Sequence, residues 1–156
     1  MIKPARKAKK GASLLACYKV LKPEEVAVFN ARLTPVAREI VGIVGIQKAL
    51  ILFSEFKGQS IIFPKDAHGN GAKKFKAMAD HIGNDAVIAL RKHYDYAKVY
   101  IPSCSYALRA VNHYKIISTY DELTKTISGN MAVRQIGKAF NLAERSVEQI
   151  LNRPTT

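Results

Sequence analysis

Apolar residues recur at helical spacing in two consecutive blocks near the carboxyl end of the chain, within residues 131–153. A block of this kind has one apolar face that packs inward and one polar face. The break between the blocks falls at Asn141, a residue type that tolerates the left-handed backbone of a sharp turn. Gly137 and Ala139 are small enough to let a second helix approach closely. The apolar positions are Val133, Ile136 and Phe140 before the break, and Leu142, Val147, Ile150 and Leu151 after it.

This spacing predicts a helix-turn-helix whose second helix begins near Ala143. The outer face of that helix would be polar, as in a DNA-recognition helix that reaches base edges. An ordinary two-helix hairpin that packs for stability has the same spacing, so the pattern alone leaves both interpretations open. The polar residues of this face are Glu144, Arg145, Ser146, Glu148, Gln149 and Asn152.

The middle of the chain repeats one pattern. Gly45 corresponds to Gly83 and Pro64 to Pro102, a constant offset of 38 residues. Each copy begins with glycine, continues through a helix-compatible stretch, and ends in a short β-type segment closed by proline. Short strands are not stable unpaired, so we expect the two segments to pair with each other or across a dimer. These segments are residues 60–63 and 98–101.

Further helices are expected between and around the repeats. Pro23 and Pro35 favour helix starts, with acidic residues after the first and Thr34 as a cap before the second. Residues 66–71 are rich in turn formers, and the basic amphipathic stretch at residues 72–82 predicts a helix after them.

The predicted fold is mainly α with short β-strands: a helical dimerisation region, a strand linker and a carboxyl-terminal helix-turn-helix. Serines at residues 103–105 are expected to cap a helix through Tyr114 or beyond, and residues 128–130 to break the chain before the helix-turn-helix. The predicted regions are a basic segment at 1–22, a helical region with the duplicated unit at 23–102, and a DNA-binding domain at 103–156.

The net charge of the chain indicates which kinds of partner to expect. It contains 25 Lys and Arg against 12 Asp and Glu, a net charge of +13 over 156 residues. Such a balance favours a polyanionic partner: DNA, RNA or an acidic membrane surface. A hydrophobic content of 48% excludes a disordered basic tail protein. Residues 1–13 carry five positive charges and no acid; a solubilising tail is the preferred interpretation over an arm that touches phosphates.

The chain is expected to be a cytoplasmic protein of a bacterial host, with no membrane partner. No apolar stretch approaches the roughly 18 residues that span a bilayer. Lys19 soon interrupts the apolar run at residues 14–17, which argues against a signal peptide. Cys17 and Cys104 form no metal-ligand pattern, so reduced thiols are expected.

Enzyme chemistry is not expected, and neither is a metal or a cofactor. The sequence has no HExxH motif, no glycine-rich phosphate loop and no nucleophile elbow. Five tyrosines crowd one region, where partly buried packing is the preferred interpretation over stacking on bases. The histidines are His68, His81, His93 and His113, and the tyrosines are Tyr94, Tyr96, Tyr100, Tyr106 and Tyr114.

The run from Lys98 to Pro102 reads Lys-Val-Tyr-Ile-Pro. It precedes a helix containing Arg109, a Gly129-Asn130 break and the predicted helix-turn-helix. This order resembles the Mor/C family of transcription activators from Mu-like bacteriophages, whose hallmark is a glycine-rich turn followed by a strand ending Tyr-Ile-Pro. The resemblance covers residues 83–153, with residues 45–64 as a second copy of the helix–strand unit.

The resemblance implies a homodimer that binds double-stranded DNA and activates phage promoters by contacting host RNA polymerase. It implies that the helices at residues 23–56 dimerise and that antiparallel strands link them to two reader domains. Lys98 and Tyr100 would then lie on the strand that approaches the DNA between half-sites. Two departures stand out: Asp95-Tyr96 occupies the place of the family's glycine pair, and the segment after Pro102 is longer.

The expected function is sequence-specific activation of transcription in a phage or prophage operon. Arg145 is expected to form hydrogen bonds with guanine, and Gln149 with adenine. The residues expected to contact phosphates are Arg134, Lys138 and Arg153. A helix-turn-helix repressor, and a basic structural or RNA-binding protein, are the alternatives. The full set of expected DNA contacts is Lys98, Tyr100, Arg134, Lys138, Glu144, Arg145, Ser146, Gln149, Asn152 and Arg153.

Overall fold

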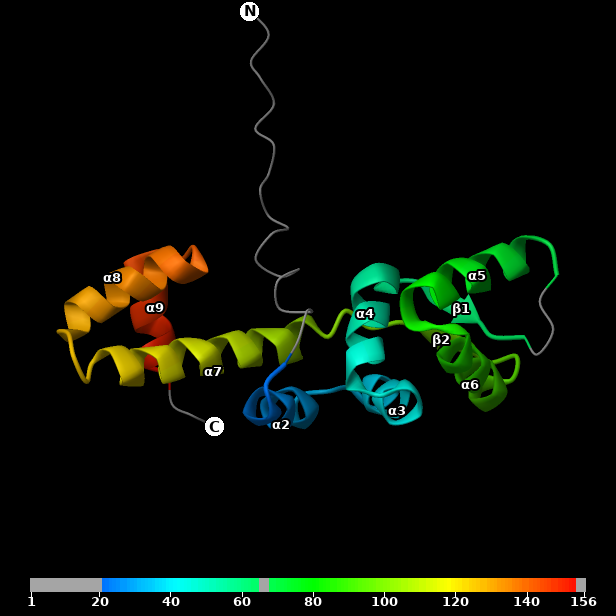
Figure 1. Ribbon diagram of the computed structural model, residues 1–156, viewed down its shortest axis with the longest axis horizontal. Coiled ribbons are helices and arrows are strands. Elements are labelled where there is room, and N and C mark those ends of the chain that lie inside the picture. Colours follow the sequence, from blue (N-terminus) through cyan, green and yellow to red (C-terminus); the bar gives the residue numbers. More distant parts are fainter. Residues whose placement is uncertain (1–20, 65–67, 154–156) are drawn as a thin grey trace, which may run out of the picture.

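The computed structural model describes residues 21–64 and 68–153, which form eight helices and one two-stranded antiparallel sheet. The predicted fold class, mainly α with short strands, is confirmed at this level. The molecule is elongated, and α7 runs from the group of helices and strands at one end to α8 and α9 at the other (Figure 1). The elements are α2 (Pro23–Ala31), α3 (Pro35–Val44), α4 (Ile46–Phe56), β1 (Ser60–Ile62), α5 (Asn70–Ile82), α6 (Asn84–Tyr94), β2 (Lys98–Tyr100), α7 (Ser105–Leu123), α8 (Gly129–Phe140) and α9 (Glu144–Leu151).

The repeat is larger than the sequence predicted, because a further helix precedes each glycine. We call α3, α4 and β1 the first unit, and α5, α6 and β2 the second unit. Gly45 and Gly83 separate the two helices of each unit at φ +83° and +89°, a conformation that residues with side chains rarely adopt. At the offset of 38 residues, buried Ile40 of α3 corresponds to buried Met78 of α5.

The two units are related by an approximate twofold axis through the centre of the sheet. Ile61 and Val99 occupy equivalent positions of the two units and lie opposite each other in β1 and β2. The helices exchange partners in the same way, since α3 contacts α6 and α4 contacts α5. The strands therefore pair within one chain, which settles the alternative that the sequence left open.

The backbone hydrogen bonds at the ends of the strands follow the same symmetry. Gly58 N–H donates to the Ile101 carbonyl oxygen at 2.8 Å. The equivalent bond joins Tyr96 N–H to the Phe63 carbonyl oxygen, also at 2.8 Å. The duplicated sequence thus builds, within one chain, a twofold arrangement like that of the two copies in a symmetric dimer.

A large apolar core joins the two units with α2 and the first turns of α7. Phe63 of the first unit is fully buried, and its ring centroid lies 5.8 Å from that of Phe75 and 5.6 Å from that of Tyr94. The apolar side chains of residues 23–56, which the sequence suggested as a dimer surface, are mostly buried in this core. Those buried are Phe29, Leu33, Ala37, Ile40, Ala49, Leu50, Leu52, Phe53 and Phe56.

The predicted helix starts at Pro23 and Pro35 are confirmed. Thr34 Oγ1 accepts a hydrogen bond from Ala37 N–H at 3.3 Å, and the Glu25 carboxylate accepts one from Lys22 N–H at 3.0 Å. Side-chain acceptors at these positions satisfy backbone donors that the first turn of a helix leaves without partners.

Three predicted loops and caps differ from the structure. α5 begins at Asn70, inside the predicted loop at residues 66–71. α8 begins at Gly129, because Ser128 Oγ accepts from Met131 N–H at 3.5 Å and starts the helix early. The predicted serine cap of α7 is absent: Cys104 occupies the cap position with φ +51° and no side-chain hydrogen bond.

α7 takes part in two separate cores. Its first turns contribute Leu108 and Val111 to the large core, and Ile116 joins a small core made with α8 and α9. Nineteen residues at 1.5 Å each give this helix a length of about 28 Å. The small core holds Val133, Ile136 and Val147 as its other buried members.

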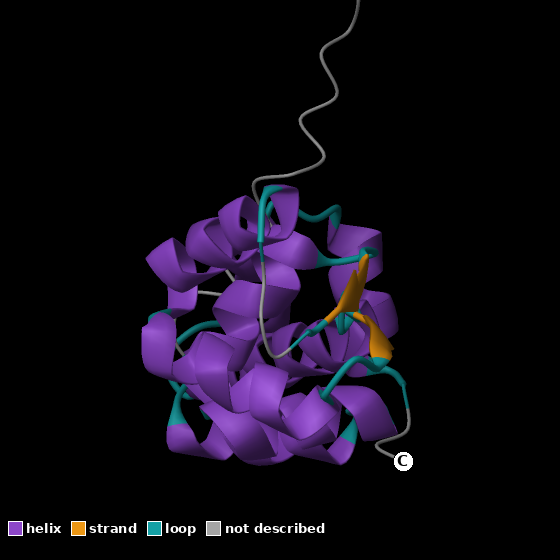
Figure 2. Ribbon diagram, turned by 90° about the vertical axis from the view of Figure 1, so that its right-hand side faces the viewer, coloured by secondary structure: helices purple, strands orange, loops and turns teal. Residues whose placement is uncertain are grey.

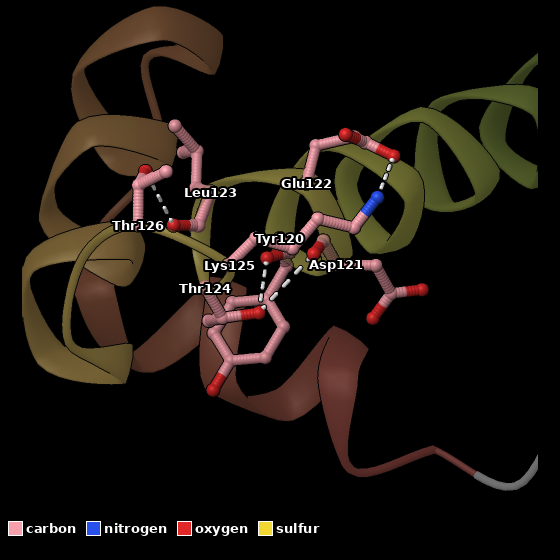
Figure 3. A network of polar contacts seen from close by, with 7 residues as sticks. All are labelled: Tyr120, Asp121, Glu122, Leu123, Thr124, Lys125 and Thr126. Atoms are coloured by element: carbon pink, nitrogen blue, oxygen red, sulfur yellow. Dashed lines mark hydrogen bonds and ion pairs between the residues drawn. The ribbon is translucent and has the colours of Figure 1, made fainter.

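The end of α7 is fixed by a group of local polar contacts (Figure 3). Thr124 Oγ1 donates to the Tyr120 carbonyl oxygen at 2.9 Å, and Thr126 Oγ1 donates to that of Leu123 at 3.3 Å. Lys125 Nζ lies 2.7 Å from Glu122 Oε1. The hydroxyls satisfy carbonyl groups left over at the helix end, and the chain is directed into α8.

Candidate nucleic-acid interface

α8 and α9 are joined by a tight turn at residues 141–143. Asn141 adopts the predicted left-handed conformation, with φ +54° and ψ +48°. Leu142 N–H donates to the Gly137 carbonyl oxygen at 2.8 Å. A Cβ atom added to Gly137 would lie 2.9 Å from the Leu142 carbonyl oxygen, closer than real Cβ atoms come. The close approach predicted for Gly137 is confirmed, whereas Ala139 is exposed and takes no part in it.

α9 begins at Glu144, next to the predicted start near Ala143, and packs one face inward. Val147 is fully buried, and Ile150 and Leu151 are partly buried against α7 and α8. Ser146 is partly buried. The structure brings the other predicted residues of this helix together on one exposed face, which we call the α9 face. Its members are Glu144, Arg145, Glu148, Gln149 and Asn152.

The cations expected to hold phosphates fall into two places. Arg134 and Lys138 are exposed on α8, and Arg134 Nε lies 3.5 Å from Glu144 Oε1 at the start of α9. Both side chains of this ion pair are more than half exposed, so it adds little stability. Arg153 lies instead in a groove between α2, α7 and α9, beside Arg109.

Lys98 and Tyr100 lie far from the α9 face, at the opposite end of α7 (Figure 1). Side chains alternate in β2, because Lys98 and Tyr100 are exposed while Val99 is buried. Ile62 pairs with Lys98 in the sheet and is 54% exposed. Figure 2 shows the two strands at the side of the helices. The expected DNA contacts thus form two surfaces, the α9 face and an exposed face of the strands.

The turn before β2 contains no glycine. Asp95 and Tyr96 both have positive φ, +22° and +65°. Tyr96 is 62% exposed, and Tyr100 and Tyr106 are also exposed, so the prediction of partly buried packing is wrong for these three. It is right for Tyr94 and Tyr114, which are partly buried.

Sequence reasoning missed the groove that contains Arg153. Arg32 of α2 and His113 of α7 also line it, together with Arg109. These residues belong to helices that are distant in the sequence, and no local spacing relates them. Their proximity follows from the packing of α2 and α9 against α7, which the sequence did not reveal.

Among the described residues, no three His, Cys, Asp or Glu side chains gather into a group that could hold a metal ion. Cys104 is a free thiol, and burial raises its pKa to about 12, so it is protonated at neutral pH. The helices of the described ranges are all too short or too polar to cross a membrane. Comparison of the chain with protein-family models, curated proteins and solved structures gave no match.

Proposed function

We propose that this chain binds duplex DNA in a sequence-specific manner, with α8 and α9 acting as a helix-turn-helix. The observation that carries this proposal is the corner between the two helices. The contact of Gly137 with Leu142 and the left-handed Asn141 hold α9 against the small core while its polar face is exposed. Such a face can enter the major groove, where each base pair presents its own pattern of donors and acceptors.

The residues of the α9 face have the chemistry for direct reading of bases. Arg145 can donate two hydrogen bonds to guanine O6 and N7, and Gln149 can make a bidentate pair with adenine N6 and N7. Lys138 and Arg134 lie on the adjoining helix and are suited to phosphate contacts, which set the position of the protein on DNA.

The strands supply a second point of contact in this proposal. The strands lie beyond one end of α7 and the α8–α9 corner lies at its other end, and α7 alone is about 28 Å long. Lys98 and Tyr100 would meet the backbone there, the lysine by its charge and the tyrosine by its hydroxyl. This arrangement suits an activator of the Mor/C type that acts on a phage or prophage operon and recruits host RNA polymerase.

The proposed assembly is a homodimer, because one recognition helix reads only a short half-site. The strands pair with each other within the chain, so the second copy does not pair through the inner edges of β1 and β2. Light scattering at micromolar concentration should give twice the chain mass, and a strict monomer that binds DNA tightly would contradict the dimer.

The rival proposals are a repressor and a basic structural or RNA-binding protein. The net charge of +13 alone supports any of these, since phosphate contacts bind all sequences. A repressor would use the same α9 face and differ in lowering, rather than raising, the output of a reporter gene.

Selection of bound sequences from a random duplex library tests the proposal. We expect enrichment of one sequence, and a preference for it that persists at physiological salt. Equal binding of the enriched duplex, random duplex and RNA, with equal loss on adding salt, would contradict specific DNA binding and favour the structural or RNA-binding alternative.

A further inference from the structure

A groove of about 480 Å³ lies between α2, α7 and α9, outside the α9 face and the strands. Its size falls within the range of small-molecule sites. Val28 and Ala31 of α2, Ile117 of α7 and Ile150 of α9 give it apolar walls. The groove therefore offers a place for an apolar body as well as for charge.

Positive charge concentrates along the groove. The guanidinium groups of Arg32, Arg109 and Arg153 line it, and no lining residue is acidic. Burial lowers the pKa of His113, and the positive charges of Arg153 and Arg109 lower it further, so both guanidinium groups act on the same imidazole of the groove. An anion that binds among like positive charges lowers their mutual repulsion.

Tyrosine side chains complete the groove. Arg32 Nη1 donates to Tyr106 Oη at 3.2 Å, and the Arg32 guanidinium carbon lies 5.8 Å from the centroid of the same ring. This contact holds α2 against the first turn of α7. Tyr114 lines the groove about two turns further along the same face of α7. Guanidinium forks match carboxylate and phosphate oxygens, while phenol rings and aliphatic walls match a flat apolar body.

We propose that this groove binds a small organic anion, with one carboxylate, sulfonate or phosphate group on a flat apolar body. The ligand would touch α2 of the large core and α9 of the small core at once. It would therefore fix the orientation of α9 relative to the rest of the chain. This second step rests on the proposed function, and it makes the ligand an effector of DNA affinity.

Calorimetry with three probes tests the site without DNA. We expect 1-naphthalenesulfonate to bind at one site per chain. Inorganic sulfate lacks the apolar body and 1-naphthalenemethanol lacks the anionic group, so each should bind at least tenfold more weakly. Arg109→Gln should weaken the sulfonate at least tenfold. Arg38→Gln, a matched change at an exposed position of α3, should leave the affinity for the sulfonate unaltered. No saturable binding, or equal binding by both variants, would overturn the proposal.

DNA titrations separate this inference from the proposed function. Saturating 1-naphthalenesulfonate should change the affinity for the selected duplex at least threefold in the parent but not in Arg109→Gln. If the sulfonate binds and no DNA does, the site stands and the proposed function fails. If DNA displaces the sulfonate completely and Arg109→Gln lowers random-DNA affinity, the groove is a phosphate contact and the site proposal is wrong.

Discussion

The first and second units share one backbone plan, but their exposed surfaces have diverged. Buried positions stay apolar in both, as with Ile40 and Met78. The exposed strand positions differ, because Ser60 and Ile62 in the first unit correspond to Lys98 and Tyr100 in the second. Residues 73–100 contain six Lys and Arg, whereas the equivalent residues 35–62 contain three. Packing demands the shared pattern, whereas no folding requirement explains the added charge of the second unit.

The largest effect is expected where the two units depend on each other. Phe63 and Ile101 occupy equivalent positions just after the strands, and both are fully buried. Phe63→Ala should lower the free energy of unfolding by about 3–5 kcal/mol and Ile101→Ala by about 2–5 kcal/mol, since each leaves a cavity between the units. Urea unfolding measures both. A loss below 1 kcal/mol at either site would contradict a shared core.

The turns before and after the strands allow a reciprocal exchange. Gly58 and Tyr96 are equivalent and have φ +77° and +65°. Gly58→Ala should cost about 1–2 kcal/mol, because a side chain is strained there although nothing lies within 4 Å of the added Cβ. Tyr96→Gly should stabilise by about 0.5–1 kcal/mol, since it relieves that strain and the tyrosine ring is mostly exposed. A stabilised Gly58→Ala or a destabilised Tyr96→Gly in thermal unfolding would contradict the equivalence.

The exposed strand positions test whether the second unit alone meets DNA. Lys98→Ala with Tyr100→Ala should leave the fold intact, weaken DNA binding and abolish activation of a reporter by host polymerase. The slope of log affinity against log salt should fall by about 1 for the lost lysine. Ser60→Ala with Ile62→Ala is the matched control on the same face of the sheet, and its slope should not change. If both double variants activate like the parent, the strands are a scaffold only.

The smallest effect is expected at an ion pair that has no equivalent on the other side of the twofold axis. His93 Nε2 lies 2.7 Å from Glu39 Oε1, and Tyr94 Oη donates to Glu39 Oε2 at 3.1 Å. The position equivalent to Glu39 is Ala77, which has no polar side chain.

The hydrogen bonds from His93 and then Tyr94 lower the pKa of Glu39. A carboxyl with a lowered folded pKa contributes stability above its unfolded value of about 4.5, and this contribution is lost as the pH falls through the folded value. Glu39→Ala should therefore make the urea midpoint less dependent on pH in acid. An unchanged pH profile would show that the pair contributes nothing.

Features with local causes were predictable from the sequence. Thr34 caps α3 and Asn141 turns left-handed because each acts on backbone groups within a few residues. The constant offset also revealed the duplicated helix and strand. It did not reveal that α3 and α5 belong to the repeat, since their sequences share only buried positions such as Ala37 and Phe75.

Features that depend on distant packing were not predictable. Cys104 rather than a serine occupies the cap position of α7, and α5 and α8 begin at Asn70 and Gly129, earlier than the sequence predicted. Turn-forming residues indicate breaks, but neighbouring helices decide how many residues each break contains. The positive charge of the groove that Arg153 lines comes from residues of three helices, so it could be recognised only once these helices were placed in space.

The central claim is that the α9 face reads DNA sequence, and one ratio tests it most directly. This is the affinity for the selected duplex divided by that for a randomised duplex, at physiological salt. Arg145→Ala should lower the ratio roughly 5- to 150-fold, the equivalent of about 1–3 kcal/mol for one base contact. Arg38→Ala removes one positive charge from an exposed position of α3 and should leave the ratio unchanged. Equal ratios for the parent and Arg145→Ala would contradict the account.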